Sequence, residues 1–414
     1  RRQSYLQDRG QTRRHSPDYW VLILTVALAA VGIVVVFSIS PALEVEKGVD
    51  GTQYVLRQII AVMLGLVLFF AASAVPMSRW KTLYKPLLIL AAVVTLLALV
   101  MPVNTQYPAH RWIRFAGFSF QSVELLKFAG ILWLAGFLSW RASNGMMANL
   151  NKTLKPLLFI FLGTGVVVAG LQSDLGSFGV IVAIMFAMVF AAGMPMKKVM
   201  LGVVAIVLLG SIFVISTPYR RDRLTAFLHP ESDCLTTGYQ ACQALIAVGS
   251  GGMVGLGLGR SVQAYGYLPE AENDSIFAIY AEKFGFIGSA ALLGLFAAFF
   301  TRIKKVMERA PDDFSRFVVL GILVWLSAQT VINIGAIIGL LPLKGITLPL
   351  VSYGGSSVLM VMAALGVVFQ VSRHTLYSIP EENNSVSGGG TGYEDRRNGR
   401  RVRGAYNPAL GRRS

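Results

Sequence analysis

The chain has 414 residues, of which 54% are hydrophobic and 14% charged, and its mean hydropathy is +0.60. Soluble domains carry about 25% charged residues, so this composition excludes a soluble enzyme and indicates a protein that crosses a membrane several times. The formal net charge is +16, but the basic residues lie in loops and tails, and no nucleic-acid partner is expected.

Residues 1–18 are polar, and the apolar run after them is too long for the core of a cleavable signal peptide. A helix needs roughly 17–25 residues to cross a bilayer. Ten apolar runs reach or approach this length: 19–39, 56–74, 86–103, 123–140, 156–172, 175–193, 199–216, 276–302, 314–341 and 356–371. We therefore expect an all-α polytopic membrane protein with about ten transmembrane helices.

These runs divide the chain into three regions. Residues 1–18 form an N-terminal segment, residues 19–373 a ten-helix membrane domain, and residues 374–414 a basic tail. The longest polar excursion, residues 217–275, is expected to be a large extracytoplasmic loop between helices 7 and 8. The tail lacks apolar periodicity and is rich in Ser, Gly, Asn and Arg, so we expect it to be disordered.

Basic residues alternate between the two sides of the membrane. Clusters of Lys and Arg precede the first span, occur in every second loop and continue in the tail. Examples are Arg79 and Lys81 after the second span, and Lys304 and Lys305 after the eighth. Because Lys and Arg concentrate in cytoplasmic loops, both termini are expected in the cytoplasm. The loop 217–275 then lies on the outer side.

Several arginines nevertheless fall on the outer side, where positive charge works against this orientation. They are Arg111, Arg114, Arg220, Arg221, Arg223 and Arg260. A guanidinium group binds phosphate oxygens through two parallel hydrogen bonds, so a phosphate ligand is the natural partner of Arg111, Arg220 and Arg223. Arg114 and Arg221 are explained equally well as surface charges.

The fourth span contains two charges, Glu124 and Lys127. Each costs about 2.5–3.5 kcal/mol to insert, whereas an i,i+3 ion pair returns about 0.2–0.5 kcal/mol on an exposed helix. Either both side chains extend to the outer surface, or they face a polar cavity where they contact substrate or support its walls. We predict that they share an outer cavity with Asp274.

The stretch 265–288 places three carboxylates directly before the span that begins at Ile276. These are Glu270, Glu272 and Asp274. They form either a solvated loop that caps the helix or a catalytic group at the outer membrane face. Asp274 is the best held of the three, because it follows a Tyr-Leu-Pro segment and immediately precedes a membrane helix.

Smaller polar features occur along the outer side. Asp174 is most simply the N-cap of the following helix, and Gln240 and Gln243 lie on one face of a short helix in the large loop. Ser356 begins the last span, where an outward helix N-terminus favours an anion, although an ordinary serine cap explains it equally well.

Cysteine, glycine and histidine residues bear on three further kinds of site: a disulfide, a nucleotide-binding motif and a metal site. Cys234 and Cys242 are the only cysteines, and both fall on a side that can be oxidising, so we predict a disulfide, with two free thiols as the alternative. The glycines at 255, 257 and 259 lack the strand and helix of a nucleotide-binding motif. The four histidines show no metal-ligand spacing.

Five segments occur in the order typical of a known family: RWIRFAGFSFQSVELLKFA, QSDLGS, YRRDRLTAFLHP, GLGLGRSVQAYGYLPEAENDSIFAIYAEKFGFIG and NIGAIIGLLPLKGITLPLVSYGGSS. Over residues 18–373 the chain resembles the shape, elongation, division and sporulation family, and the sequence of residues 344–349 resembles that of its septal branch. The resemblance implies a ten-helix peptidoglycan glycosyltransferase of the bacterial cytoplasmic membrane. Such an enzyme polymerises lipid II at the division septum with a class B penicillin-binding protein and other divisome proteins.

The resemblance also implies roles for individual residues. It places the family's catalytic acid at Asp274 and implies matches at Arg111, Glu124, Lys127, Asp174, Gln240 and Gln243. The chain departs from the family at positions 272, 273 and 275. We expect Asp274 to be catalytic, and the substrate to contact the six matched residues together with Arg220, Arg223, Glu270 and Ser356.

The chemistry of lipid II polymerisation fits these residues. A sugar hydroxyl attacks an anomeric carbon that bears a lipid diphosphate, so it needs a base, and the departing diphosphate needs cations. Asp274 and the outer arginines supply both, with inversion at the anomeric carbon and no cofactor, although a divalent cation is left open. The alternatives are a lipid II flippase and a scaffold that activates the penicillin-binding protein. The flippase is less favoured, because a transporter places its binding site near the midplane, whereas here the polar residues gather on the outer side.

Overall fold

The computed structural model describes residues 12–14, 16–48, 50–101, 111–115, 118–147, 149–197, 234–236, 238–343 and 345–376, with a few isolated residues between 200 and 227. The chain divides into two compact units, Arg1–Tyr377 and Ser378–Ser414. The second unit lies outside the described residues, as do Arg220, Arg223 and Lys344.

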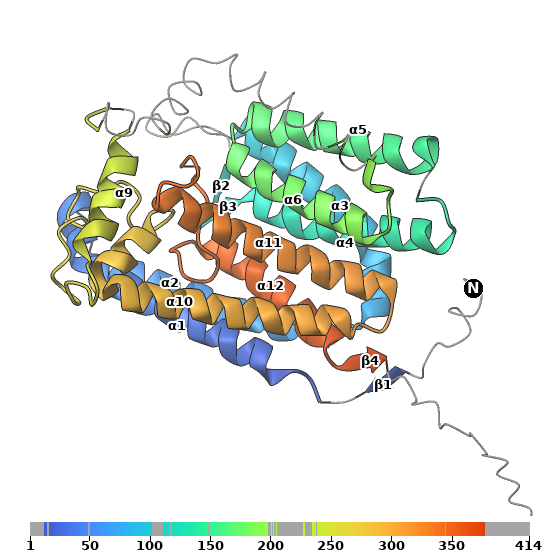
Figure 1. Ribbon diagram of the computed structural model, residues 1–414, viewed down its shortest axis with the longest axis horizontal. Helices are drawn as coiled ribbons and strands as arrows, with labels where there is room; N and C mark the ends of the chain where they lie inside the picture. Colours follow the sequence, from blue (N-terminus) through green and yellow to red (C-terminus); the bar gives the residue numbers. More distant parts are fainter. Residues whose placement is uncertain are drawn as a thin grey trace, which may run out of the picture. The chain divides into compact units, whose positions relative to one another are not determined.

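The first unit is a bundle of helices (Figure 1). Its helices are α1 (Tyr19–Lys47), α2 (Gly51–Ala74), α3 (Met77–Val100), α4 (Ser122–Ser143), α5 (Lys155–Thr164), α6 (Leu175–Ala191), α9 (Tyr239–Ser250), α10 (Ile276–Glu308), α11 (Asp313–Ile337) and α12 (Gly355–Val371). Two π-helical turns, Leu150–Leu154 and Gly165–Leu171, flank α5. Two antiparallel strand pairs complete it: β1 (Thr12–Arg14) with β4 (His374–Leu376), and β2 (Trp112–Phe115) with β3 (Phe118–Gln121).

The predicted membrane architecture is confirmed. In the described part of the chain, seven helices are long and apolar enough to cross a membrane, and α6 and α12 are shorter apolar helices. These account for nine of the ten predicted runs, while the run 199–216 lies almost wholly outside the described residues. Helix α1 continues past residue 39 to Lys47, because Ala42 and Leu43 are still buried and Gly48 then ends the helix in the left-handed conformation.

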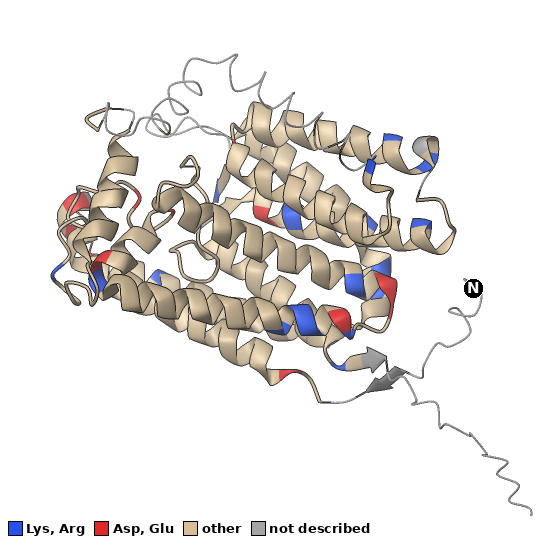
Figure 2. Cartoon of the chain, viewed as in Figure 1, with Lys and Arg blue, Asp and Glu red and all other residues tan. Residues whose placement is uncertain are grey.

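Helices α4 and α11 are the most buried of the seven long spans, and α3 is the least buried. Helix α11 packs on α4, α6 and α10, and α12 packs on α2. Charged residues gather mainly toward the two ends of the bundle (Figure 2), whereas Glu124 and Lys127 on α4 are buried within it. Polar groups on α4 and α11 are therefore held in the interior, where they need protein partners.

Helix α10 is broken by a kink at Gly285, which has φ 65° and ψ −163°. The segment 251–257 supplies the hydrogen bonds that the kink interrupts. Leu256 N and Gly257 N donate to the carbonyls of Glu282 and Lys283 at 2.9 and 3.0 Å, and Phe286 N donates to Gly252 O at 2.9 Å. The glycine run 255–259 therefore includes a backbone brace for the helix that follows Asp274.

Candidate active site

Asp274 lies at the end of the loop before α10, and its main chain is clamped from two elements. Asn333 on α11 donates through Nδ2 to Asp274 O at 2.7 Å. The two preceding carbonyls are held by the loop before α12, since Ser352 Oγ donates to Asn273 O at 2.6 Å and Tyr353 N donates to Glu272 O at 2.9 Å. The carboxylate is therefore carried on backbone that cannot move independently of the bundle.

The carboxyl group of Asp274 is held in an unfavourable environment for charge. Its Oδ1 atom is buried and has no hydrogen-bond partner among the described residues. Burial, reinforced by the negative charge of Glu270, raises the pKa of Asp274 to about 7, although a hydrogen bond from Gln240 acts in the opposite direction. A carboxyl group with such a pKa can exchange protons near neutral pH.

A small cavity opens beside this carboxylate. Its volume is about 10 Å³, which is the space of roughly one water-sized group. Its lining comes from the Asp274 loop, from α11 and from the segment after α11: Asp274, Ile332, Asn333, Ala336, Leu343, Gly345 and Ile346. The cavity therefore forms only when the loop, α11 and residues Leu343, Gly345 and Ile346 are in place.

Arg111, the residue immediately before β2, extends its side chain toward the Asp274 carboxylate. Its Nε and Nη2 atoms donate to the carbonyls of Gln172 and Ser173 at 3.2 and 3.1 Å, which orients the guanidinium. A Cβ placed on Gly345 would lie 3.9 Å from Arg111 Nη1 and 3.7 Å from Asp274 Oδ2. Gly345 therefore leaves room for a cation and a carboxylate to approach the same point.

Two other predicted residues serve the local structure. Asp174 caps α6, as the sequence indicates: its Oδ1 accepts from Ser177 N at 3.0 Å. Its Oδ2 accepts from Gln121 Nε2 at 3.4 Å, and Gln121 N in turn donates to Ser356 Oγ at 3.3 Å. Asp174 and Ser356 thus both hold β3, the strand that leads into α4.

Glu124 and Lys127 lie inside the bundle, each only 2% exposed. Lys127 Nζ donates to Glu124 Oε1 at 2.8 Å and to Gln329 Oε1 on α11 at 2.9 Å. Among the cavities of the described residues, Lys127 lines one between α3, α4, α5 and α6, separate from the one lined by Asp274. The contact of Lys127 with Gln329 points the ammonium group toward α11, and a cavity shared with Asp274 stays a prediction.

Gln329 and Asn333 are polar residues of the site that the sequence analysis missed. Gln329 Nε2 donates to Thr347 O at 2.9 Å, and Asn333 Nδ2 donates to Ile346 O at 2.7 Å. The signal was available: two amides four residues apart within an apolar span lie on one helix face, where lipid offers them no partner. Together they attach the segment 345–347 to α11.

The large loop contributes through α9. Gln240 Nε2 donates to Ser275 Oγ at 3.1 Å, next to Asp274. Gln243 lies about one turn further along the same helix and is half-buried. Glu270 has a left-handed φ of 53° and accepts a hydrogen bond from Asn273 Nδ2, whereas Glu272 is buried. The described part of the loop is thus folded tightly around the carboxylates and is not an open acidic loop.

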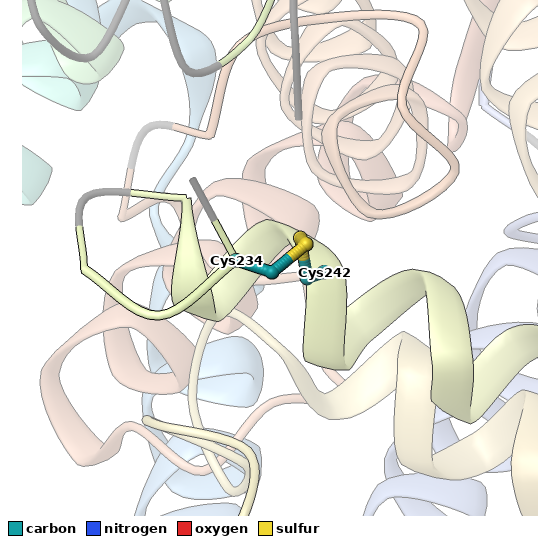
Figure 3. Close-up of a disulfide and its surroundings, with 2 residues drawn as sticks. All are labelled: Cys234 and Cys242. Carbon is teal, nitrogen blue, oxygen red and sulfur yellow. A yellow bond between two sulfur atoms is a disulfide. The ribbon is translucent and has the colours of Figure 1, made fainter. Parts of the chain in front are cut away.

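The predicted disulfide is confirmed. Cys234 and Cys242 are joined with an S–S distance of 2.00 Å across eight residues (Figure 3). The bond ties the segment before α9 to the first turn of that helix, which is the turn that carries Gln240.

Comparison with known proteins gives the family. Residues 19–377 match the "Cell cycle protein" family of FtsW, RodA and SpoVE. The chain is 39% identical over 367 residues to a "Probable peptidoglycan glycosyltransferase FtsW" of Coxiella burnetii, covering 87% of this chain and 97% of that protein. It is 37% identical over 369 residues to "Stage V sporulation protein E" of Bacillus subtilis, covering 88% of this chain and all of that protein (100%).

Solved structures show the same fold. A chain from "Structural coordination of polymerization and crosslinking by a peptidoglycan synthase complex" matches with a TM-score of 0.72 and 30% identity, covering 86% of this chain and 98% of that chain. The rod shape determining protein RodA of Thermus thermophilus matches with a TM-score of 0.62 and 27% identity, covering 86% and 97%. The match over residues 19–377 and these likenesses confirm the resemblance seen in the sequence, and the chain belongs to the FtsW, RodA and SpoVE family of cell cycle proteins.

Proposed function

We propose that this protein is a peptidoglycan glycosyltransferase that polymerises lipid II at the outer face of the cytoplasmic membrane during cell division. The observation that carries the proposal is the Asp274 carboxyl group, whose pKa is raised to about 7 and whose main chain is clamped by α11. The names of the relatives, peptidoglycan glycosyltransferases among them, support the same reaction class. The orientation with both termini in the cytoplasm belongs to this proposal.

Asp274 acts as the general base in this proposal. As the acceptor sugar hydroxyl attacks the anomeric carbon of the donor, its proton passes to Asp274, and the bond from that carbon to the lipid diphosphate breaks. A base with a pKa near the working pH suits this step. The new bond forms opposite the leaving group, so the configuration inverts and no covalent enzyme intermediate forms.

Arg111 receives the leaving diphosphate in this proposal. Its guanidinium is already oriented by two carbonyl acceptors, so little reorganisation is needed when charge develops on the diphosphate oxygens. Arg220 and Arg223 are proposed to assist from the part of the large loop outside the described residues. Gln240, Gln243 and Glu270 are proposed to line the substrate path on the loop side.

The proposed partner is a class B penicillin-binding protein, with other divisome membrane proteins nearby. It is supported by the likeness to a chain of a peptidoglycan synthase complex that coordinates polymerisation and crosslinking. The septum is the proposed location, and the partner's transpeptidase would crosslink the strands that this chain makes.

The test compares Asp274→Asn, Glu270→Gln and Glu272→Gln on labelled lipid II with the partner synthase present. Asp274→Asn keeps size and removes basicity, so polymer formation should fall by on the order of 10² or more, while the two glutamine variants lose less. Near-normal polymer from Asp274→Asn would contradict the assignment and make Glu270 the next candidate. Movement of lipid II across liposomes without polymer would favour a flippase, and activation of the partner alone a scaffold.

A further inference from the structure

The side-chain amide of Asn333 uses both of its N–H donors in hydrogen bonds, and the residue also lines the cavity beside Asp274. Its Nδ2 atom donates to Asp274 O and to Ile346 O, both at 2.7 Å. A primary amide has two N–H donors, so these two carbonyls use both of them. The orientation of the amide follows, because only the nitrogen can face two carbonyl oxygens.

The oxygen of the same amide is consequently turned away from both carbonyls. Asn333 Oδ1 is buried and without a hydrogen-bond partner among the described residues, as is Asp274 Oδ1. Both residues line the same small cavity. A charge placed on the Asn333 side chain would therefore face the carboxylate of Asp274 across a small buried cavity, where screening by solvent is weak.

We propose that Asn333 is a positioning residue for glycosyl transfer, which holds Asp274 and the segment 345–347 in a single geometry. One amide joins the main chain of the base to the segment where Gly345 lies between Asp274 and Arg111. This inference rests on the proposed function and adds a residue to it. Asn333 acts on the reaction through Asp274 and contacts no reacting atom.

Gln329 extends the same arrangement by one turn of α11. It donates to Thr347 O at 2.9 Å and accepts from Lys127 Nζ at 2.9 Å. The buried ion pair of Glu124 and Lys127 thus supports the segment 345–347 from the far side. Gln329 is a matched control for Asn333, because it holds the same segment but does not line the Asp274 cavity.

The experiment measures kcat and KM for lipid II as a function of pH in Asn333→Asp, with Gln329→Glu as the control. Within the part of the chain that the structure describes, the charged groups near Asp274 are Glu270 and Glu272 on its own loop and Arg111 beside β2. A new carboxyl group in the shared cavity makes the last proton harder to remove. Asn333→Asp should therefore shift the acid limb of kcat/KM to higher pH by about one unit or more.

At pH 7 kcat of Asn333→Asp should fall about tenfold or more, because activity follows the ionised base, with KM changed little. Gln329→Glu should weaken activity without moving the limb, because its added charge lies beside Lys127. Asn333→Ala adds no charge; it should lower kcat without an upward shift of the limb.

The outcomes separate the two proposals. If Asp274→Asn makes normal polymer, the proposed function fails. If Asp274→Asn is inactive but Asn333→Asp keeps the wild-type limb, only the role of Asn333 fails. Should Asn333→Asp not fold, Asn333→Ala decides: a change in KM alone, or wild-type kcat, overturns the inference.

Discussion

Asp274 owes its proton affinity to burial first and to the charge of Glu270 second. Because its pKa is raised to about 7, the ionised base is lost as the pH falls through neutrality. We expect kcat/KM to decline as the medium becomes more acidic, with the midpoint of this acid limb of the pH profile near pH 7. In Glu270→Gln the limb should move to lower pH, since one of the two main causes of the raised pKa is gone.

This prediction is checked by polymerisation rates between about pH 5 and 9 at constant ionic strength. Glu308→Gln is the control, because that carboxylate belongs to the opposite end of α10 and pairs with Lys304. A limb that stays in place in Glu270→Gln would show that Glu270 does not act on the base. An acid limb with its midpoint near pH 4 in the wild type would show that the catalytic base does not have a raised pKa.

Helix α10 depends on the brace that crosses its kink. A Cβ on Gly255 would lie 2.1 Å from Lys283 O, and Gly255 has a φ of 83°. Gly257 has a similar φ of 91°, but nothing lies within 4 Å of the corresponding position. Both alanine variants should carry backbone strain of about 1–3 kcal/mol, while Gly255→Ala also forces the brace away from α10.

Thermal unfolding in detergent distinguishes the two variants. Gly255→Ala should unfold at a clearly lower temperature than Gly257→Ala and should lose activity, because the start of α10 positions Asp274. Equal unfolding temperatures would mean that the contact at Lys283 O relaxes without cost. In that case the brace would not be needed for the helix.

At the scale of the whole membrane domain, packing of α4 against α11 depends on a buried ion pair. Glu124 and Lys127 on α4 form the pair, and Lys127 also donates to Gln329 on α11. Removing one partner leaves the other charge buried and unpaired, which costs about 3–5 kcal/mol. We expect Lys127→Met and Glu124→Gln each to lower the unfolding temperature strongly. The double variant should be less destabilised than Lys127→Met, because no unpaired charge remains.

A thermodynamic cycle on the four proteins measures this coupling, with activity recorded in parallel. If both charges act by contacting substrate, the double variant is inactive while its unfolding temperature stays near that of the wild type. Additive losses of stability would show that the two side chains do not depend on each other. Either result would exclude the supporting role that their contacts with α11 indicate.

The local pattern of the chain predicted much of this protein. Lipid cannot satisfy backbone polar groups, so each span had to be a helix, and long apolar runs show where these lie. Asp174 was recognised as a cap because capping acts within one turn, and the two cysteines could be paired because no others compete. Asp274 was singled out by its place between a Pro-containing loop and a membrane helix, together with its match to the family's catalytic acid.

Tertiary structure decided how the polar groups meet. Lys127 contacts Gln329 across 202 residues, Arg111 contacts Gln172 across 61, and Asn333 contacts Asp274 across 59. Local periodicity shows which face of a helix is polar but not which distant helix lies opposite it. The partner of Lys127, the clamp on Asp274 and the approach of Arg111 at Gly345 therefore exist only once α4, α11 and the segment 345–347 are packed together.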